Sequence, residues 1–65
     1  MQHSHGARLR LLRQRAEMTQ CALSAATGIS QGEISRLESD RSYLGATRLR
    51  RIAAALNVTP ADIIA

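Results

Sequence analysis

The sequence has 65 residues, the size of one small domain, and it can bury only a small hydrophobic core. This size argues against an enzyme with a deep pocket that excludes water. Nine arginines against five acidic residues give a formal net charge of +4, which points to a polyanionic partner. Tyr43 is the only aromatic residue, so the stacking of bases on aromatic side chains, which many single-strand and RNA binders use, has almost no material here.

Cysteine content and hydropathy exclude further classes of protein. Cys21 is the only cysteine, which excludes a disulfide scaffold and an all-cysteine zinc site. The longest apolar run, Ile52 to Leu56, is far shorter than the roughly 20 residues that span a membrane. Histidines and arginines interrupt the N-terminal stretch that a secretory signal would need. These features together predict a cytoplasmic or nucleoid-associated protein. The sequence also lacks a metal constellation, a nucleophile–base pair and a glycine-rich phosphate loop, so we expect neither an enzyme nor a cofactor.

The first predicted helix covers about residues 6–16 and follows a flexible N-terminal arm at residues 1–5. His3 and His5 in this arm are close enough to suggest a metal site, but a third ligand is lacking, so we expect disorder instead. Thr19 is typical of an N-cap, and a second helix is expected from there to about residue 26. The residues that should face the core from these two helices are Leu9, Leu12, Ala16, Leu23 and Ala26.

A third helix is predicted directly after a short turn. Gly28 stands where a helix C-terminus favours a residue in the left-handed conformation. Ser30 and Glu33 then form the Ser-x-x-Glu capping box, which starts a helix that reaches about Ser39. Residues 40–45 are expected to form a loop.

The last two helices complete the predicted fold. Residues 46–56 carry an apolar stripe with helical period, and Thr59-Pro60 is typical of the N-cap and first turn of a final helix. The inward stripe of the first of these two helices is expected to be Leu49, Ile52, Ala53 and Leu56, and the final helix holds Ile63 and Ile64. Because no segment alternates with the period of a strand, the sequence predicts an all-α bundle of five short helices in one domain, residues 6–65.

The spacing of the second and third helices carries functional information. Two helices of about eight residues with a three-residue turn around Gly28 cannot pack antiparallel, so they should cross steeply, as in a helix-turn-helix that presents its second helix to the major groove of DNA. Ile34 and Leu37 should face inward on the third helix. The outward positions are Gln31, Gly32, Ser35 and Arg36. Gln, Ser and Arg side chains can read base edges, although any surface helix also exposes polar residues.

Two charged residues lie on helix faces that should be apolar. Arg13 is on the inner stripe of the first helix, and Glu38 is on the inner side of the third. The simplest arrangement is an ion pair, because removing one partner would leave a buried charge without compensation. We expect this pair to fix the first helix against the third. The alternative is that each side chain reaches water separately.

An ordered set of residues runs through nearly the whole chain, from about Leu9 to Ile64. Its members are Leu12-Arg13, Met18-Thr19-Gln20, Leu23, Ala26, Gly28-Ile29-Ser30, Ile34-Ser35-Arg36-Leu37-Glu38, Leu49, Ile52-Ala53, Ala55-Leu56, Val58 and Asp62-Ile63-Ile64. The set resembles the phage-repressor and Cro-like helix-turn-helix family, also called the xenobiotic-response-element type. The resemblance implies a lambda-repressor-like fold. It also implies a sequence-specific regulator of transcription that binds double-stranded operator DNA as a homodimer, most simply a repressor.

The resemblance further implies roles for individual residues. Base-reading positions fall on Gln31, Gly32, Glu33, Ser35 and Arg36. Contacts with the DNA backbone fall on Thr19, Gln20, Arg41, Ser42 and Tyr43, and Arg10 in the first helix is a further candidate. The ion pair of the family falls on Arg13 and Glu38, in agreement with the argument from the helix faces.

Three positions depart from the family pattern. Gly32 has no side chain, so either the helix approaches the groove more closely at this point or that base goes unread. Glu33 can accept a hydrogen bond from cytosine, although the capping box already explains it. Asp40 replaces a loop glycine; it tolerates the left-handed conformation but adds a negative charge near the DNA backbone.

Other interpretations stay open at this point. Cys21 is expected on an exposed face of the second helix, as a passive thiol or as a redox switch. Apolar residues near the ends of the domain are compatible with the core or with a dimer seam; they are Tyr43, Leu44, Ile63 and Ile64. The same fold also serves as a protein-binding module, such as an antitoxin that holds a toxin. A basic amphipathic peptide on a membrane surface is a second rival.

Overall fold

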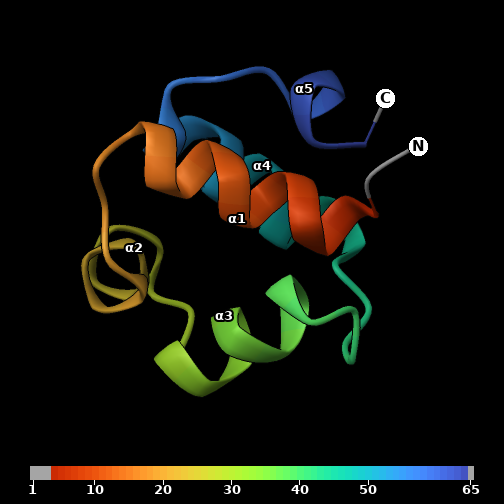
Figure 1. Cartoon of the computed structure of the whole chain (residues 1–65), viewed down its shortest axis with the longest axis horizontal. Helices are drawn as coiled ribbons and strands as arrows, with labels where there is room; N and C mark the ends of the chain where they lie inside the picture. The colour runs from red at the N-terminus through yellow and green to blue at the C-terminus, as the bar shows by residue number, and fades with distance from the viewer. Residues whose placement is uncertain (1–3, 65) are drawn as a thin grey trace.

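A computed structural model describes residues 4–64 of the chain as five α-helices, with no β-strand in that range (Figure 1). The helices are α1 (His5–Arg15), α2 (Gln20–Thr27), α3 (Gln31–Glu38), α4 (Gly45–Leu56) and α5 (Pro60–Ile64). Helix α1 packs on α3 and α5, while α2 packs on α3 and α4, and α4 also contacts α5. The prediction of an all-α bundle of five short helices is therefore confirmed.

Side-chain caps set the starts of the first three helices. The hydroxyl oxygens of Ser4, Thr19 and Ser30 each accept a hydrogen bond from the backbone N–H three residues further on, at 3.1, 3.0 and 3.2 Å. Ser4 is the cap and His5 is the first residue of α1, so this helix begins one residue before the predicted start at about residue 6. His3 lies outside the described residues.

Gly28 and the start of the last helix adopt the conformations that the sequence predicts. Gly28 ends α2 with φ 77°, in the left-handed region that glycine adopts without steric cost. Thr59 caps α5, since its hydroxyl oxygen accepts from the N–H of Asp62 at 3.2 Å and the Asp62 carboxylate accepts from the N–H of Thr59 at 2.8 Å.

Nine apolar side chains form the core between the helices. They are Leu9, Leu23, Ile29, Ile34, Leu37, Ile52, Ala53, Leu56 and Ile63. Leu12 and Leu49 are partly buried against this cluster. Of the two isoleucines that were left open between the core and a dimer seam, Ile63 is in the core and Ile64 is 44% exposed.

Two alanines that were expected in the core are exposed. Ala16 is the C-cap of α1, beyond its last residue Arg15, and on α2 the buried position belongs to Thr27 instead of Ala26. Thr27 can be buried because its hydroxyl donates to the Leu23 carbonyl at 2.7 Å and accepts from the N–H of Ile29 at 3.2 Å. The inward stripes therefore run through satisfied polar residues, which hydropathy alone ranks below alanine.

Gly6 and Asp40 bring the start of α1 against the end of α3. Gly6 is buried, and a Cβ atom at this position would lie 2.7 Å from the carbonyl oxygen of Glu38. Asp40 has φ 59°, as its place in the loop suggested, and its Oδ1 accepts from the N–H of Gly6 at 3.0 Å. Hydrogen bonds from the Ser4 hydroxyl and from this N–H lower the pKa of Asp40. The carboxylate of Asp40 is thus bound to the start of α1, and the negative charge that it was expected to add near the DNA backbone stays a prediction.

Candidate nucleic-acid interface

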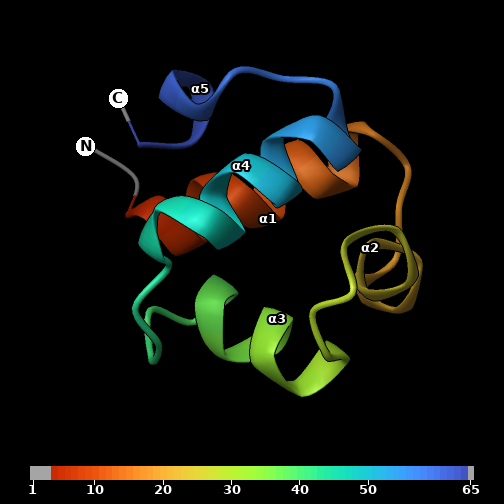
Figure 2. The ribbon, with the colours of Figure 1, turned by 180° about the vertical axis from the view of Figure 1, so that it is seen from behind.

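Helices α2 and α3 cross steeply, as the short turn between them predicts. Figure 1 shows α2 almost end-on while α3 is seen from its side, and the view from behind shows the same relation (Figure 2). Ile29 is buried in the turn, and Gly28 supplies the left-handed residue that redirects the chain. This is the geometry of a helix-turn-helix.

Helix α3 separates an apolar inner face from a polar outer face. Ile34 and Leu37 are buried in the core. The exposed residues of α3 include Gln31, Gly32, Ser35 and Arg36. Four of the five expected base-reading positions are therefore exposed, whereas Glu33 is half-buried and its carboxylate is bonded to other side chains.

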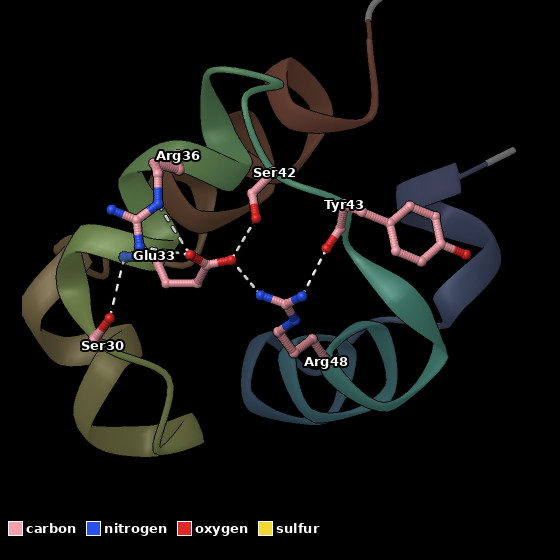
Figure 3. A network of polar contacts seen from close by, with 6 residues as sticks. All are labelled: Ser30, Glu33, Arg36, Ser42, Tyr43 and Arg48. Atoms are coloured by element: carbon pink, nitrogen blue, oxygen red, sulfur yellow. Dashed lines mark hydrogen bonds and ion pairs between the residues drawn. The ribbon is translucent and has the colours of Figure 1, made fainter.

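The carboxylate of Glu33 lies at the centre of a polar network (Figure 3). Its Oε1 accepts from Nε and a terminal nitrogen of Arg36 at 3.0 and 2.7 Å. Its Oε2 accepts from the hydroxyl of Ser42 and from a terminal nitrogen of Arg48. Arg48 also donates to the backbone carbonyl of Tyr43 at 2.8 Å. One acidic side chain therefore connects α3, the following loop and α4.

This network changes the expected role of Glu33. The N–H of Glu33 donates to the hydroxyl oxygen of the N-cap Ser30, as expected. Its carboxylate, however, accepts from Arg36, Ser42 and Arg48 rather than completing a capping box. Four donors fill the roughly four lone-pair sites of the carboxylate, which leaves no acceptor for a cytosine amino group. The hydrogen bond from Ser42, followed by that from Arg36, lowers the pKa of Glu33 to about 2.

A second, buried network joins α1 to α3. Arg13 donates from Nε to Oε2 of Glu38 at 2.6 Å and from a terminal nitrogen to Oε1 at 3.1 Å. Its other terminal nitrogen donates to the carbonyl of Met18 at 2.8 Å. Gln20 donates from its amide nitrogen to Oε1 of Glu38 at 3.1 Å. The ion pair expected from the helix faces is thus present, and it also engages the residue expected to bind a phosphate.

The other residues expected to contact the DNA backbone differ in exposure. Thr19, Arg10 and Arg41 are exposed, and Tyr43 is 85% exposed, whereas Ser42 is half-buried by its bond to Glu33.

Cys21 is exposed, as expected. Its Sγ donates to the side-chain oxygen of Gln31 at 3.3 Å, across the turn of the helix-turn-helix.

Sequence reasoning missed Arg48 as part of this surface. Its position in the first turns of α4 gives no local signal, because its partners Glu33 and Tyr43 lie 15 and 5 residues away. A half-buried acidic residue that accepts hydrogen bonds from three residues was not visible from the spacing of α3 alone.

None of the described helices is both long and apolar enough to cross a membrane. A family model described as "Helix-turn-helix" matches residues 9–63, most of the chain. Neither the curated proteins nor the solved structures gave a match. The matched range includes α2, the turn and α3 together with their supporting helices. The chain belongs to the helix-turn-helix family of the xenobiotic-response-element, Cro-like type, and is a DNA-binding regulator.

Proposed function

We propose that this protein is a non-enzymatic, sequence-specific regulator of transcription that acts as a homodimeric repressor in the cytoplasm and places α3 in the major groove of operator DNA. The observation that supports this most is the exposed face of α3, where Arg36 stands beside Gln31 and Ser35 on a helix that crosses α2 steeply. The net charge of +4 favours the approach to a polyanion but carries no sequence information.

Arg36 is the strongest base-reading residue in this proposal. A guanidinium has five N–H donors, and the bonds from Nε and one terminal nitrogen to Glu33 use two of them. The remaining donors include one N–H on each terminal nitrogen, a pair that matches O6 and N7 of guanine. Glu33 thus holds Arg36 by one edge and leaves the other edge for a base.

Gly32 assists Arg36 by leaving space. A Cβ atom at this position would lie 3.7 Å from a terminal nitrogen of Arg36, which is ordinary van der Waals contact. A longer side chain would occupy the volume of the guanidinium. We assign Gln31 and Ser35 to neighbouring bases, because both are exposed on the same face.

Contacts with phosphates fix the helix in the groove. One N–H of the Gln20 amide goes to Glu38, and we assign the other to a phosphate oxygen. Thr19, Arg41 and Tyr43, with Arg10 on α1, supply further contacts from exposed positions. Ser42 acts on the DNA through Glu33 rather than directly, since its hydroxyl donates to that carboxylate.

A homodimer would read two half-sites about one helical turn apart. Tyr43 and Ile64 are exposed and line the same shallow surface hollow with Leu44 and Leu49, which makes this hollow the candidate dimer seam.

Selection of duplexes from a random pool tests the proposal. We expect the winning sequences to converge on a pseudo-palindrome, with sedimentation showing two chains per duplex. Convergence on a single half-site would remove the dimer from the proposal. No convergence would contradict sequence-specific binding and would favour the protein-binding alternative.

A further inference from the structure

Arg48 lies on α4, outside the helix-turn-helix, yet it bonds both to α3 and to the loop that follows α3. One terminal nitrogen donates to Oε2 of Glu33 on α3, and the other donates to the carbonyl of Tyr43 in the loop at 2.8 Å. The planar fork of the guanidinium suits two acceptors that are fixed relative to each other. Arg48 therefore ties the loop and α3 to α4 through a single side chain (Figure 3).

The two oxygens of Glu33 are divided between different partners. Oε2 is taken by Arg48 and Ser42, and Oε1 is left to Arg36. With Oε2 held on one side, the carboxylate cannot rotate freely, so Oε1 stays in place for Nε of Arg36. The orientation of the Arg36 guanidinium thus depends on a bond that Arg36 does not itself make.

The charges of the network point the same way. Glu33 contributes one negative charge, and Arg36 and Arg48 contribute one positive charge each, so the three together carry +1. Without Arg48 the carboxylate and Arg36 would neutralise each other, which would weaken the attraction of Arg36 for acceptors in the groove. Of the three arginines of α4, all within the described residues, Arg48 alone bonds to Glu33. Arg50 and Arg51 are exposed.

We propose that Arg48 is a specificity-determining positioning residue, which holds Glu33 so that Arg36 presents its free edge to one base pair. This inference rests on the proposed function, because it requires that Arg36 read a base. A direct contact of Arg48 with a phosphate is the competing role, and it predicts a different pattern of affinities.

The test compares Arg48→Ala with Arg51→Ala, which removes the same charge from an exposed position of the same helix. Affinities are measured for the duplex that the wild type selects and for duplexes with each base pair replaced in turn. We expect Arg48→Ala to lose discrimination at one base pair by about fivefold or more, the low end of one bidentate base contact. This base pair should be the one that Arg36→Ala also relaxes, and Arg51→Ala should keep the wild-type discrimination.

The ratio of two affinities for one variant does not depend on the fraction of that variant that is folded, so partial unfolding does not imitate the effect. Arg48→Lys is the second variant, since it keeps the charge and loses the planar fork. We expect it to fall short of wild-type discrimination at the same base pair. Full wild-type discrimination in Arg48→Lys would overturn the role of the fork geometry.

A double-mutant cycle tests whether Arg48 acts through Glu33. In a Glu33→Ala background, Arg48→Ala should cause no further change in discrimination at that base pair. An equal loss in both backgrounds would overturn the proposed path through Glu33.

Three results separate this inference from the proposed function. If Arg48→Ala bound every duplex more weakly by the same factor, and its affinity depended less on salt by about one phosphate contact, the positioning role would be overturned. Arg48→Ala discrimination equal to that of Arg51→Ala, in a protein whose wild type discriminates well, would overturn it too. A wild type that binds all duplexes equally would overturn the proposed function itself, before any variant is measured.

Discussion

Arg13 and Glu38 are 25 residues apart, yet the Nε of Arg13 lies 2.6 Å from Oε2 of Glu38, and both side chains are largely shielded from solvent. The pair is satisfied on all sides, since Arg13 also donates to the Met18 carbonyl and Glu38 also accepts from Gln20. The pair joins α1 to α3. Because Gln20 begins α2, the same carboxylate connects α1, α2 and α3.

Glu38→Ala should destabilise the fold. The substitution leaves the Arg13 guanidinium buried without its carboxylate, which costs about 3–5 kcal/mol of the free energy of unfolding. Urea denaturation measures this loss. Arg15→Ala is the control, because Arg15 is exposed on the same helix as Arg13 and its removal should change stability by less than about 0.5 kcal/mol. An unchanged melting temperature for Glu38→Ala would contradict a structural role for the pair.

Gly6→Ala should also destabilise the fold, although alanine is the better helix former. The added Cβ would lie 2.7 Å from the Glu38 carbonyl oxygen and would also collide with the Leu37 carbonyl, so backbone must move. We expect a loss of about 1–3 kcal/mol, as for other overpacked sites. Thermal melting of Gly6→Ala beside the wild type checks this, and a raised melting temperature would show that α1 and α3 are less closely packed.

Gly32→Ala is the matched substitution at an open site, and its sign should be opposite. A Cβ fits there at 3.7 Å from Arg36, and replacing glycine within a helix stabilises by about 0.5–1 kcal/mol. Its affinity for the selected duplex should stay within a few-fold of the wild type. Gly32→Leu should instead lose base discrimination, since its side chain would displace the Arg36 guanidinium. A large loss of affinity in Gly32→Ala would instead support close approach of the bare backbone to DNA.

The Glu33 network should weaken in acid. The pKa of Glu33 falls from 4.5 to about 2 in the folded protein, chiefly through the Ser42 hydroxyl, so the carboxylate stabilises the fold above about pH 4.5 and this contribution declines as the pH falls toward 2. Asp40 and Asp62 also have lowered pKa values, so all variants should lose stability in acid.

The difference between wild type and Glu33→Gln isolates the Glu33 contribution. The gap between their melting temperatures should be constant from pH 7 to about 4.5 and should shrink below that. A gap that does not depend on pH would mean that the charge of Glu33 is unimportant to the network.

Arg36→Ala should relax base preference at one position of the binding site. The loss should be about 1–3 kcal/mol for the preferred base and much smaller for the others. Titration of the selected duplex and of its single-base variants provides the measurement. Equal weakening on every duplex would place Arg36 among the phosphate contacts.

Much of this fold could be predicted because its determinants are local. Thr19, Gly28 and Ser30 mark helix ends through bonds that span only a few residues, and the sequence shows them directly. Arg13 and Glu38 could be matched because each interrupts an otherwise apolar helix face. That argument needs only the helical period.

The remaining contacts were missed for two reasons: at one position nearby backbone groups satisfy a polar side chain, and elsewhere side chains from distant segments meet. Thr27 replaces Ala26 in the core because backbone groups at the turn satisfy its hydroxyl. The turning of Asp40 toward Gly6 depends on how the loop after α3 lies against α1, 34 residues earlier. Arg48 reaches Glu33 across 15 residues and from another helix. No pattern within a single helix carries these contacts, so they require the packed structure.

The most direct test of sequence-specific DNA binding is a titration of the selected duplex against a scrambled duplex of equal length at several salt concentrations. We predict that the selected duplex binds at least about 10³-fold more tightly at physiological salt. We also predict that this ratio persists as salt weakens both complexes. Equal affinities for the two duplexes, with both falling steeply as salt rises, would mean that only the basic surface binds, and would contradict base reading by α3.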